Sequence, residues 1–160
     1  MGKERKEKSR KRPPKEEKEM MDKLYLAHPE WTSKGIREWE KEAGIKVKFL
    51  NPFSLSGEDI SKLEGGKVSA VDYHKSLDPK NICERDISLI ESSDGVLAII
   101  SPWDSYGTHM EIVYAKILQK PVYSIVLRER DKYHPWIIEH SKKVFTSKHA
   151  FTAWAKKKWK

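Results

Sequence analysis

The feature that most constrains the fold is an apolar run, Val96 to Ile100, with no polar interruption. A strand with one solvated face alternates apolar and polar residues, so an unbroken run is typical of a strand covered on both faces. Further strand-like, mainly apolar segments lie at residues 24–27 and 122–127, and helix-like segments separate them. Such alternation indicates parallel strands joined by helices. We therefore expect an α/β fold: a doubly wound, mainly parallel sheet of four to five strands with helices on both faces, Rossmann- or flavodoxin-like.

Local signals place the other elements. Thr32 or Ser33 can cap a helix that Gly44 ends, and Asp78-Pro79 opens a helix that continues to about residue 94. The remaining expected elements are strands at 45–50 and 144–145 and helices at 58–63, 109–118, 136–141 and 150–158. A hinge is expected at Gly65-Gly66.

Length and composition exclude several classes of protein, among them disulfide-linked and membrane-spanning ones. A chain of 160 residues suits a single core. The lone Cys83 excludes an internal disulfide and a multi-cysteine metal site. No apolar stretch approaches the roughly 20 residues that a membrane span needs, and none resembles a signal peptide. We therefore expect a cytoplasmic protein that does not enter a membrane.

The net charge of +8 is concentrated at the chain ends. Residues 1–19 hold nine Lys/Arg and five Glu, and the last five residues hold four Lys. Residues 20–155 hold 19 basic and 19 acidic side chains. We predict a disordered basic tail over residues 1–20 and one domain over residues 21–160, with at most weak nucleic-acid contact through the tails.

In a parallel sheet, ligands bind beyond the carboxyl ends of the strands. The loops at 27–31, 51–56 and 101–107 therefore hold the candidate site. The sequence contains neither a Walker loop nor a glycine-rich dinucleotide fingerprint, which argues against an ATPase or a dehydrogenase. The histidines have no ligand-like spacing, so we expect no metal.

Two carboxylates could carry chemistry. Asp86 has apolar neighbours on its helix, so it is either a functional group or a structural one bonded to the backbone or to Arg85. Glu111 lies near a helix start. It completes a capping box with Thr108, or it is an ionised nucleophile suited to attack on a sugar's anomeric carbon. The residues alone leave both choices open.

The loop from Ser101 to Thr108 offers several hydroxyls and Gly107 just before a helix. This combination can hold an anion, although an ordinary polar turn has the same composition. Tyr25 lies within a strand and could simply belong to the core.

Three segments, residues 23–29, 86–100 and 104–122, resemble the nucleoside 2-deoxyribosyltransferase family, which includes the 2′-deoxynucleoside 5′-phosphate N-hydrolases. The third is the most specific, with a Gly, a Glu on a buried helix and then Lys-Pro-Val. The resemblance implies that Glu111 attacks C1′, that Asp86 assists proton transfer to the base, and that Tyr25 orients the nucleophile. It implies substrate contacts at Ala27, His28, Asp104, Ser105, Gly107 and Thr108.

The resemblance also implies a small-molecule nucleoside or nucleotide substrate, no cofactor, and a homo-oligomer. His28 departs from the small residue that the family usually has there, and Ser105 matches a serine that contacts the 5′-phosphate. We expect a retaining cleavage of the N-glycosidic bond, completed by water or a second base. The alternatives are a non-catalytic nucleotide-binding module of the same fold and an adaptor that works through its basic tails.

Overall fold

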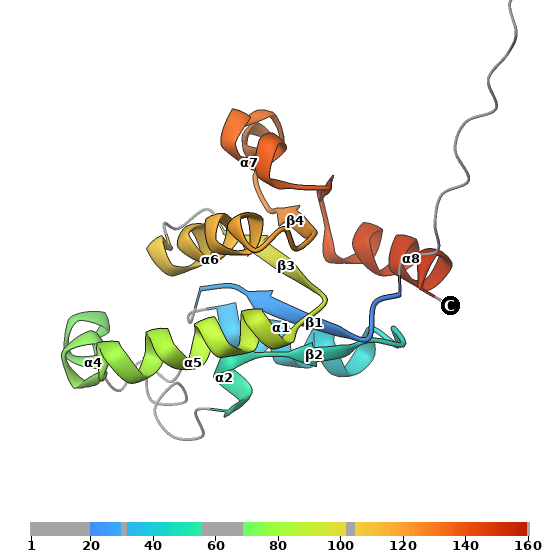
Figure 1. The fold of residues 1–160 in the computed structure, drawn as a ribbon. Helices are drawn as coiled ribbons and strands as arrows, with labels where there is room; N and C mark the ends of the chain where they lie inside the picture. Colours follow the sequence, from blue (N-terminus) through green and yellow to red (C-terminus); the bar gives the residue numbers. More distant parts are fainter. Residues whose placement is uncertain (1–19, 30–31, 56–68, 102–104, 160) are drawn as a thin grey trace, which may run out of the picture.

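The computed structural model describes residues 20–29, 32–55, 69–101 and 105–159. Its five strands form one parallel sheet in the order β2-β1-β3-β4-β5 (Figure 1). The strands are β1 (Lys23–Ala27), β2 (Lys48–Leu50), β3 (Gly95–Ile100), β4 (Val122–Val126) and β5 (Lys143–Phe145). The chain winds outward from β1 to β2 and then crosses to β3 on the other side, so the strand order reverses between β1 and β3. The predicted fold class is confirmed.

Helices connect the strands. They are α1 (Ser33–Glu42), α2 (Pro52–Leu55), α4 (Ala70–Ser76), α5 (Pro79–Ser92), α6 (Tyr106–Ile117), the 3₁₀ helix η2 (Glu129–Tyr133), α7 (Pro135–His140) and α8 (Lys148–Lys158). The sequence analysis missed α2, α4 and η2, and β2 begins three residues later than predicted. The helix expected at 58–63 and the hinge at Gly65-Gly66 lie outside the described residues.

The sheet has an apolar cluster on each face. Leu24 and Leu26 of β1 pack on one face with residues of α1 and α8, whereas Tyr25 and Ala27 pack on the other with residues of α5, α6 and α7. All six residues of β3 are buried, which is why its sequence shows no polar alternation.

Short-range signals set several helix ends as predicted. The Asp78 carboxylate accepts the backbone N–H groups of Lys80 and Asn81, and Pro79 occupies the first turn of α5. Gly44 has a φ of +58° just after α1, a conformation that favours glycine. No helix among the described residues is long and apolar enough to cross a bilayer.

Candidate active site

Helix α6 begins earlier than its sequence suggested. Ser105 is the N-cap, and its Oγ accepts the backbone N–H of Thr108 at 3.3 Å. The predicted capping box, with Thr108 as N-cap, is therefore wrong: Thr108 lies in the first turn and Glu111 in the second. A carboxylate in the second turn cannot reach back to the N-cap backbone, so the capping explanation for Glu111 no longer holds.

Glu111 instead contacts the first strand. The Tyr25 hydroxyl donates a hydrogen bond to Glu111 Oε1 at 2.7 Å. The tyrosine is fully buried in the face of the sheet that α6 covers, so its ring is fixed by packing and its hydroxyl holds the carboxylate in one orientation. The predicted role for Tyr25, orienting Glu111, remains a prediction that this contact supports.

The surroundings shift the ionisation of both groups. Burial raises the pKa of Glu111 to about 7, the hydrogen bond from Tyr25 opposes that rise, and the charge of Asp86 adds to it. Burial and the neighbouring Glu111 carboxylate raise the pKa of Tyr25 far above its ordinary value. Tyr25 therefore stays a hydrogen-bond donor at any working pH, while Glu111 exists in both protonation states near neutrality.

Asp86 lies on α5 and is paired with the preceding residue. Arg85 Nε and Nη2 lie 2.8 and 2.7 Å from Asp86 Oδ1, and the Asp86 side chain is 17% exposed. The pairing with Arg85 that the sequence left as a structural alternative is thus present. Burial raises the pKa of Asp86, and the contact with Arg85 opposes this rise.

These four side chains form one electrostatic group, the Tyr25–Glu111–Asp86–Arg85 cluster. Asp86 and Arg85 both act on the ionisation of Glu111 and Tyr25, which places them in the same neighbourhood. The sequence analysis treated Arg85 only as a partner for Asp86. The sequence signal that could have identified Arg85 as a member of the cluster is its position next to Asp86, a carboxylate on the apolar stripe of its helix.

Two predicted substrate contacts are core residues. Ala27 is fully buried at the end of β1. His28 is 4% exposed, and its ring nitrogens lie 3.0 Å from the Pro29 carbonyl oxygen and 3.3 Å from Asn51 Oδ1. Burial lowers the pKa of His28, so the ring is neutral. His28 thus ties the end of β1 to the end of β2, with both nitrogens engaged inside the protein.

The other predicted contacts gather at the start of α6. Thr108 is 2% exposed, and its hydroxyl lies 2.9 Å from that of Ser105. Gly107 is exposed, and a Cβ added there would meet no atom within 4 Å. Ser105 and Gly107 therefore face accessible space one turn ahead of Glu111. Asp104 lies outside the described residues.

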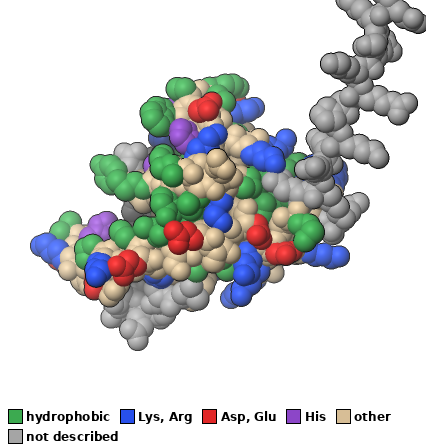
Figure 2. Space-filling model, in the orientation of Figure 1, with side chains coloured by type: hydrophobic (Ala, Val, Ile, Leu, Met, Phe, Trp, Pro, Cys, Tyr) green, Lys and Arg blue, Asp and Glu red, His purple; other side chains and the backbone are tan. Residues whose placement is uncertain are grey.

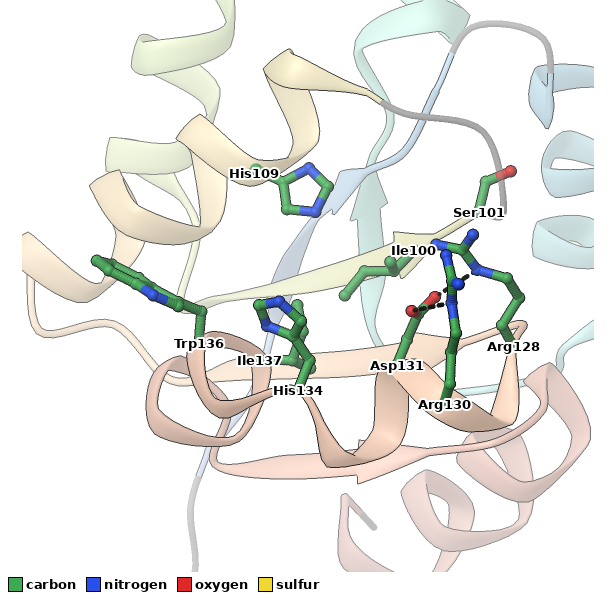
Figure 3. A pocket seen from close by; sticks show the side chains of 9 residues that line it. All are labelled: Ile100, Ser101, His109, Arg128, Arg130, Asp131, His134, Trp136 and Ile137. Atoms are coloured by element: carbon green, nitrogen blue, oxygen red, sulfur yellow. Dashed lines mark hydrogen bonds and ion pairs between the residues drawn. The ribbon is translucent and has the colours of Figure 1, made fainter.

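A cavity of about 360 Å³ lies on the other side of α6, beyond the ends of β3 and β4 (Figure 3). Ser101, His109 and His134 line it, and Arg128 and Arg130 approach the buried Asp131 at 2.8 and 3.7 Å. His109 and Glu111 are two residues apart on α6, about 200° around the helix axis. The cavity is thus separate from the cluster, and the sequence analysis assigned it no role.

Metal ligands are not grouped in the part of the chain that the structure describes, where no set of three or more His, Cys, Asp or Glu side chains could hold an ion.

Part of the chain is similar to a curated protein. A stretch of 60 residues is 40% identical to the putative 2′-deoxynucleoside 5′-phosphate N-hydrolase 1 of Thermofilum pendens. The predicted family resemblance is confirmed. The matched stretch covers 38% of this chain and 41% of the relative, so it spans less than half of that relative's length. No family model matches the chain.

Two solved structures are similar to this chain. The solution structure of BlsM has a TM-score of 0.52 and 18% identity, with 88% of each chain covered. The CMP N-glycosidase BcmB of Clostridium botulinum has a TM-score of 0.48 and 14% identity, with 82% of this chain and 96% of that chain covered. At this identity the likeness to BlsM concerns the fold alone.

Proposed function

We propose that the protein is an enzyme that cleaves the N-glycosidic bond of a nucleoside or nucleoside 5′-monophosphate, with Glu111 as the nucleophile. The observation that carries the proposal is the 2.7 Å hydrogen bond from the buried Tyr25 hydroxyl to Glu111 Oε1. A carboxylate kept out of water at this end of a parallel sheet costs stability, and functional sites are where such costs are usual. The name of the Thermofilum pendens relative, putative 2′-deoxynucleoside 5′-phosphate N-hydrolase 1, supports the same reaction class.

In the first step a Glu111 carboxylate oxygen bonds to C1′ of the sugar. The C1′–N bond breaks, and its electron pair leaves with the base. Asp86 donates a proton to the departing base, for which its raised pKa is favourable. The Tyr25 hydroxyl donates its hydrogen bond to Oε1 of Glu111 and so keeps the other carboxylate oxygen in position to attack.

In the second step water attacks C1′ of the glycosyl-enzyme. Asp86, now ionised, accepts the water's proton, and the bond from C1′ to Glu111 breaks to release the sugar and the free carboxylate. Two displacements at one carbon retain its configuration. If a second base attacks C1′ in place of water, the same intermediate transfers its sugar to that base.

The surroundings of Glu111 balance two quantities, the reactivity of the carboxylate and the fraction of the protein in which it is ionised. Desolvation makes the carboxylate more reactive and also raises its pKa to about 7, while the Tyr25 hydrogen bond and the Arg85 charge limit that rise. Without these two partners less of the enzyme would carry the ionised nucleophile at neutral pH.

We further propose that the substrate carries a 5′-phosphate. Ser105 and the exposed Gly107 lie at the N-terminal end of α6, where backbone N–H groups and the helix dipole favour an anion. When the Thr108 hydroxyl donates to Ser105 Oγ, the Ser105 hydrogen is free to donate to a phosphate oxygen.

The decisive experiment is incubation with a panel of nucleosides and 5′-monophosphates, with free base detected by chromatography. We expect base release by the wild-type protein and none by Glu111→Gln. Glu38→Gln, at an exposed position of α1, is the matched control and should keep wild-type turnover. If no substrate releases base but nucleotides still bind, the protein is a non-catalytic binding module and the proposal fails.

We also propose that the protein is a homo-oligomer, as the family resemblance implies. Tyr106, Met110, Val113 and Ile117 follow one another at helical spacing on α6 and are 83%, 70%, 38% and 70% exposed. Light scattering should show a mass above that of one chain, and Met110→Glu should shift it toward the monomer. A monomeric wild-type protein at micromolar concentration would contradict this.

A further inference from the structure

The two ends of the described part of the chain lie at one edge of the molecule. Met21, next to residues 1–19 along the chain, and Trp159, at the other end, belong to the same buried cluster. Figure 1 shows the start of β1 beside the end of α8, at the edge where the parallel strands begin. Residues 1–19, with nine Lys/Arg and five Glu, therefore join the domain next to the lysine-rich end of α8. This amino edge lies opposite the edge where α6 begins.

The folded part of the amino edge is itself basic. Its segments are the strand starts and the end of α8, residues 20–23, 43–48, 93–95, 118–122, 141–143 and 156–158. Together they hold nine lysines and two aspartates, and the exposed Glu42 at the end of α1 lies beside Lys156 and adds a third carboxylate. One of these, Asp94, already accepts the backbone N–H groups of Asp22 and Lys23. The equal numbers of basic and acidic side chains in residues 20–155 thus conceal a separation of charge in space.

Two of these lysines face each other across neighbouring strands. Lys23 of β1 lies opposite Lys48 of β2 in the parallel register, and like charges at facing positions are destabilising. Among the residues that the structure describes, no carboxylate forms an ion pair with Lys23, Lys46, Lys48 or Lys157, and all four are exposed. Figure 2 shows Lys/Arg side chains on this side of the surface, with Asp/Glu side chains among them. A bound polyanion would relieve this repulsion.

We propose that the amino edge binds the phosphate backbone of a nucleic acid without sequence preference. A lipid surface is the less suitable partner, because membrane-binding surfaces add apolar anchors to their charge. Of the exposed large apolar side chains in the described chain, only Met20 belongs to the amino-edge segments. No exposed aromatic ring lies in these segments to stack on bases, so the contacts are with phosphates and depend on salt.

Binding at this edge leaves the candidate active site open, because the Tyr25–Glu111–Asp86–Arg85 cluster lies toward the other end of the strands. The proposal therefore stands or falls independently of the N-glycosidase reaction. It predicts that a bound nucleic acid and a small nucleotide are accommodated together.

The test uses the full-length protein and a short fluorescent duplex, with binding followed by anisotropy over a series of salt concentrations. We expect the logarithm of the affinity to fall linearly with that of the salt concentration, by about 0.9 for each phosphate neutralised. The triple variant Lys46→Gln/Lys48→Gln/Lys157→Gln should make this slope shallower by about 2 to 3. Arg at the same three positions keeps the charge and should restore the wild-type slope.

The matched control is Lys75→Gln/Lys80→Gln/Lys132→Gln, which removes the same charge from exposed positions away from the amino edge. It should leave the slope close to that of the wild type. Equal losses in both triple variants would show that only net charge matters and would overturn the proposal. If the amino-edge variant keeps the wild-type slope, the binding is due to residues 1–19 alone. If the protein binds anionic vesicles more tightly than the duplex, the edge binds lipid. Either result, or binding that salt does not weaken, also rejects the proposal that the amino edge binds nucleic acid.

Discussion

Replacing Glu111 with Gln should make the folded protein more stable at alkaline pH while abolishing its proposed reaction. Glutamine has nearly the same shape and still accepts the hydrogen bond from Tyr25, but it carries no charge to bury. The wild-type side chain has a pKa of about 7 in the folded protein, against 4.5 for an ordinary glutamate. Between these two pH values the folded state retains a proton that the unfolded state releases.

The sign and size of the effect follow from that difference. A raised pKa in the folded state means that the free energy of unfolding falls as the pH rises from about 4.5 to about 7, and stays at the lower value above it. A shift of about 2.5 units corresponds to about 3 kcal/mol at 1.36 kcal/mol per unit. The stability of Glu111→Gln relative to the wild type should therefore increase by about 3 kcal/mol between pH 4 and pH 8.

Urea unfolding of both proteins at pH 4, 6 and 8 measures this directly, with Glu38→Gln as the exposed control whose difference from the wild type should stay within about 0.5 kcal/mol. Base release should fall by several orders of magnitude in Glu111→Gln only. The reasoning is refuted if the difference between Glu111→Gln and the wild type does not change with pH. It is also refuted if the variant is less stable at pH 8 and keeps near-normal turnover, since Glu111 would then be a structural residue.

Four further outcomes are expected. Tyr25→Phe should move the ascending limb of the kcat/KM–pH profile to higher pH, because the lost hydrogen bond holds the pKa of Glu111 down; an unmoved limb would contradict the contact. Asp86→Asn should slow cleavage most for poor leaving bases, and an equal loss for all bases would argue against proton donation. Ser105→Ala should cost about 1 kcal/mol of stability through the lost N-cap and should lower kcat/KM for nucleotides more than for nucleosides; equal losses would exclude a phosphate contact. Removal of residues 1–20 should leave the melting temperature and kcat/KM nearly unchanged, and a large drop in either would show that this segment packs on the domain.

Much of the fold was determined by the sequence alone, because its signals are local. The unbroken apolar run of β3 required cover on both faces, and the structure buries every residue of it. Asp78-Pro79 and Gly44 mark helix ends through the chemistry of their own side chains, and they act where predicted. The stretch from 53 to 77 carries few such signals, and α2 and α4 within it were missed. Short helices depend on their packing surroundings more than on their composition.

The candidate site depended on tertiary structure. Ser105 and Thr108 are both competent N-caps, and their sequence contains no reason to prefer one; only in the folded chain is Thr108 buried and Ser105 left to cap α6. The hydrogen bond from Tyr25 to Glu111 joins residues 86 positions apart, so no local pattern could predict its geometry. The charge of the amino edge was likewise invisible in an average over residues 20–155, because a parallel sheet gathers at one edge the starts of strands that are far apart along the chain.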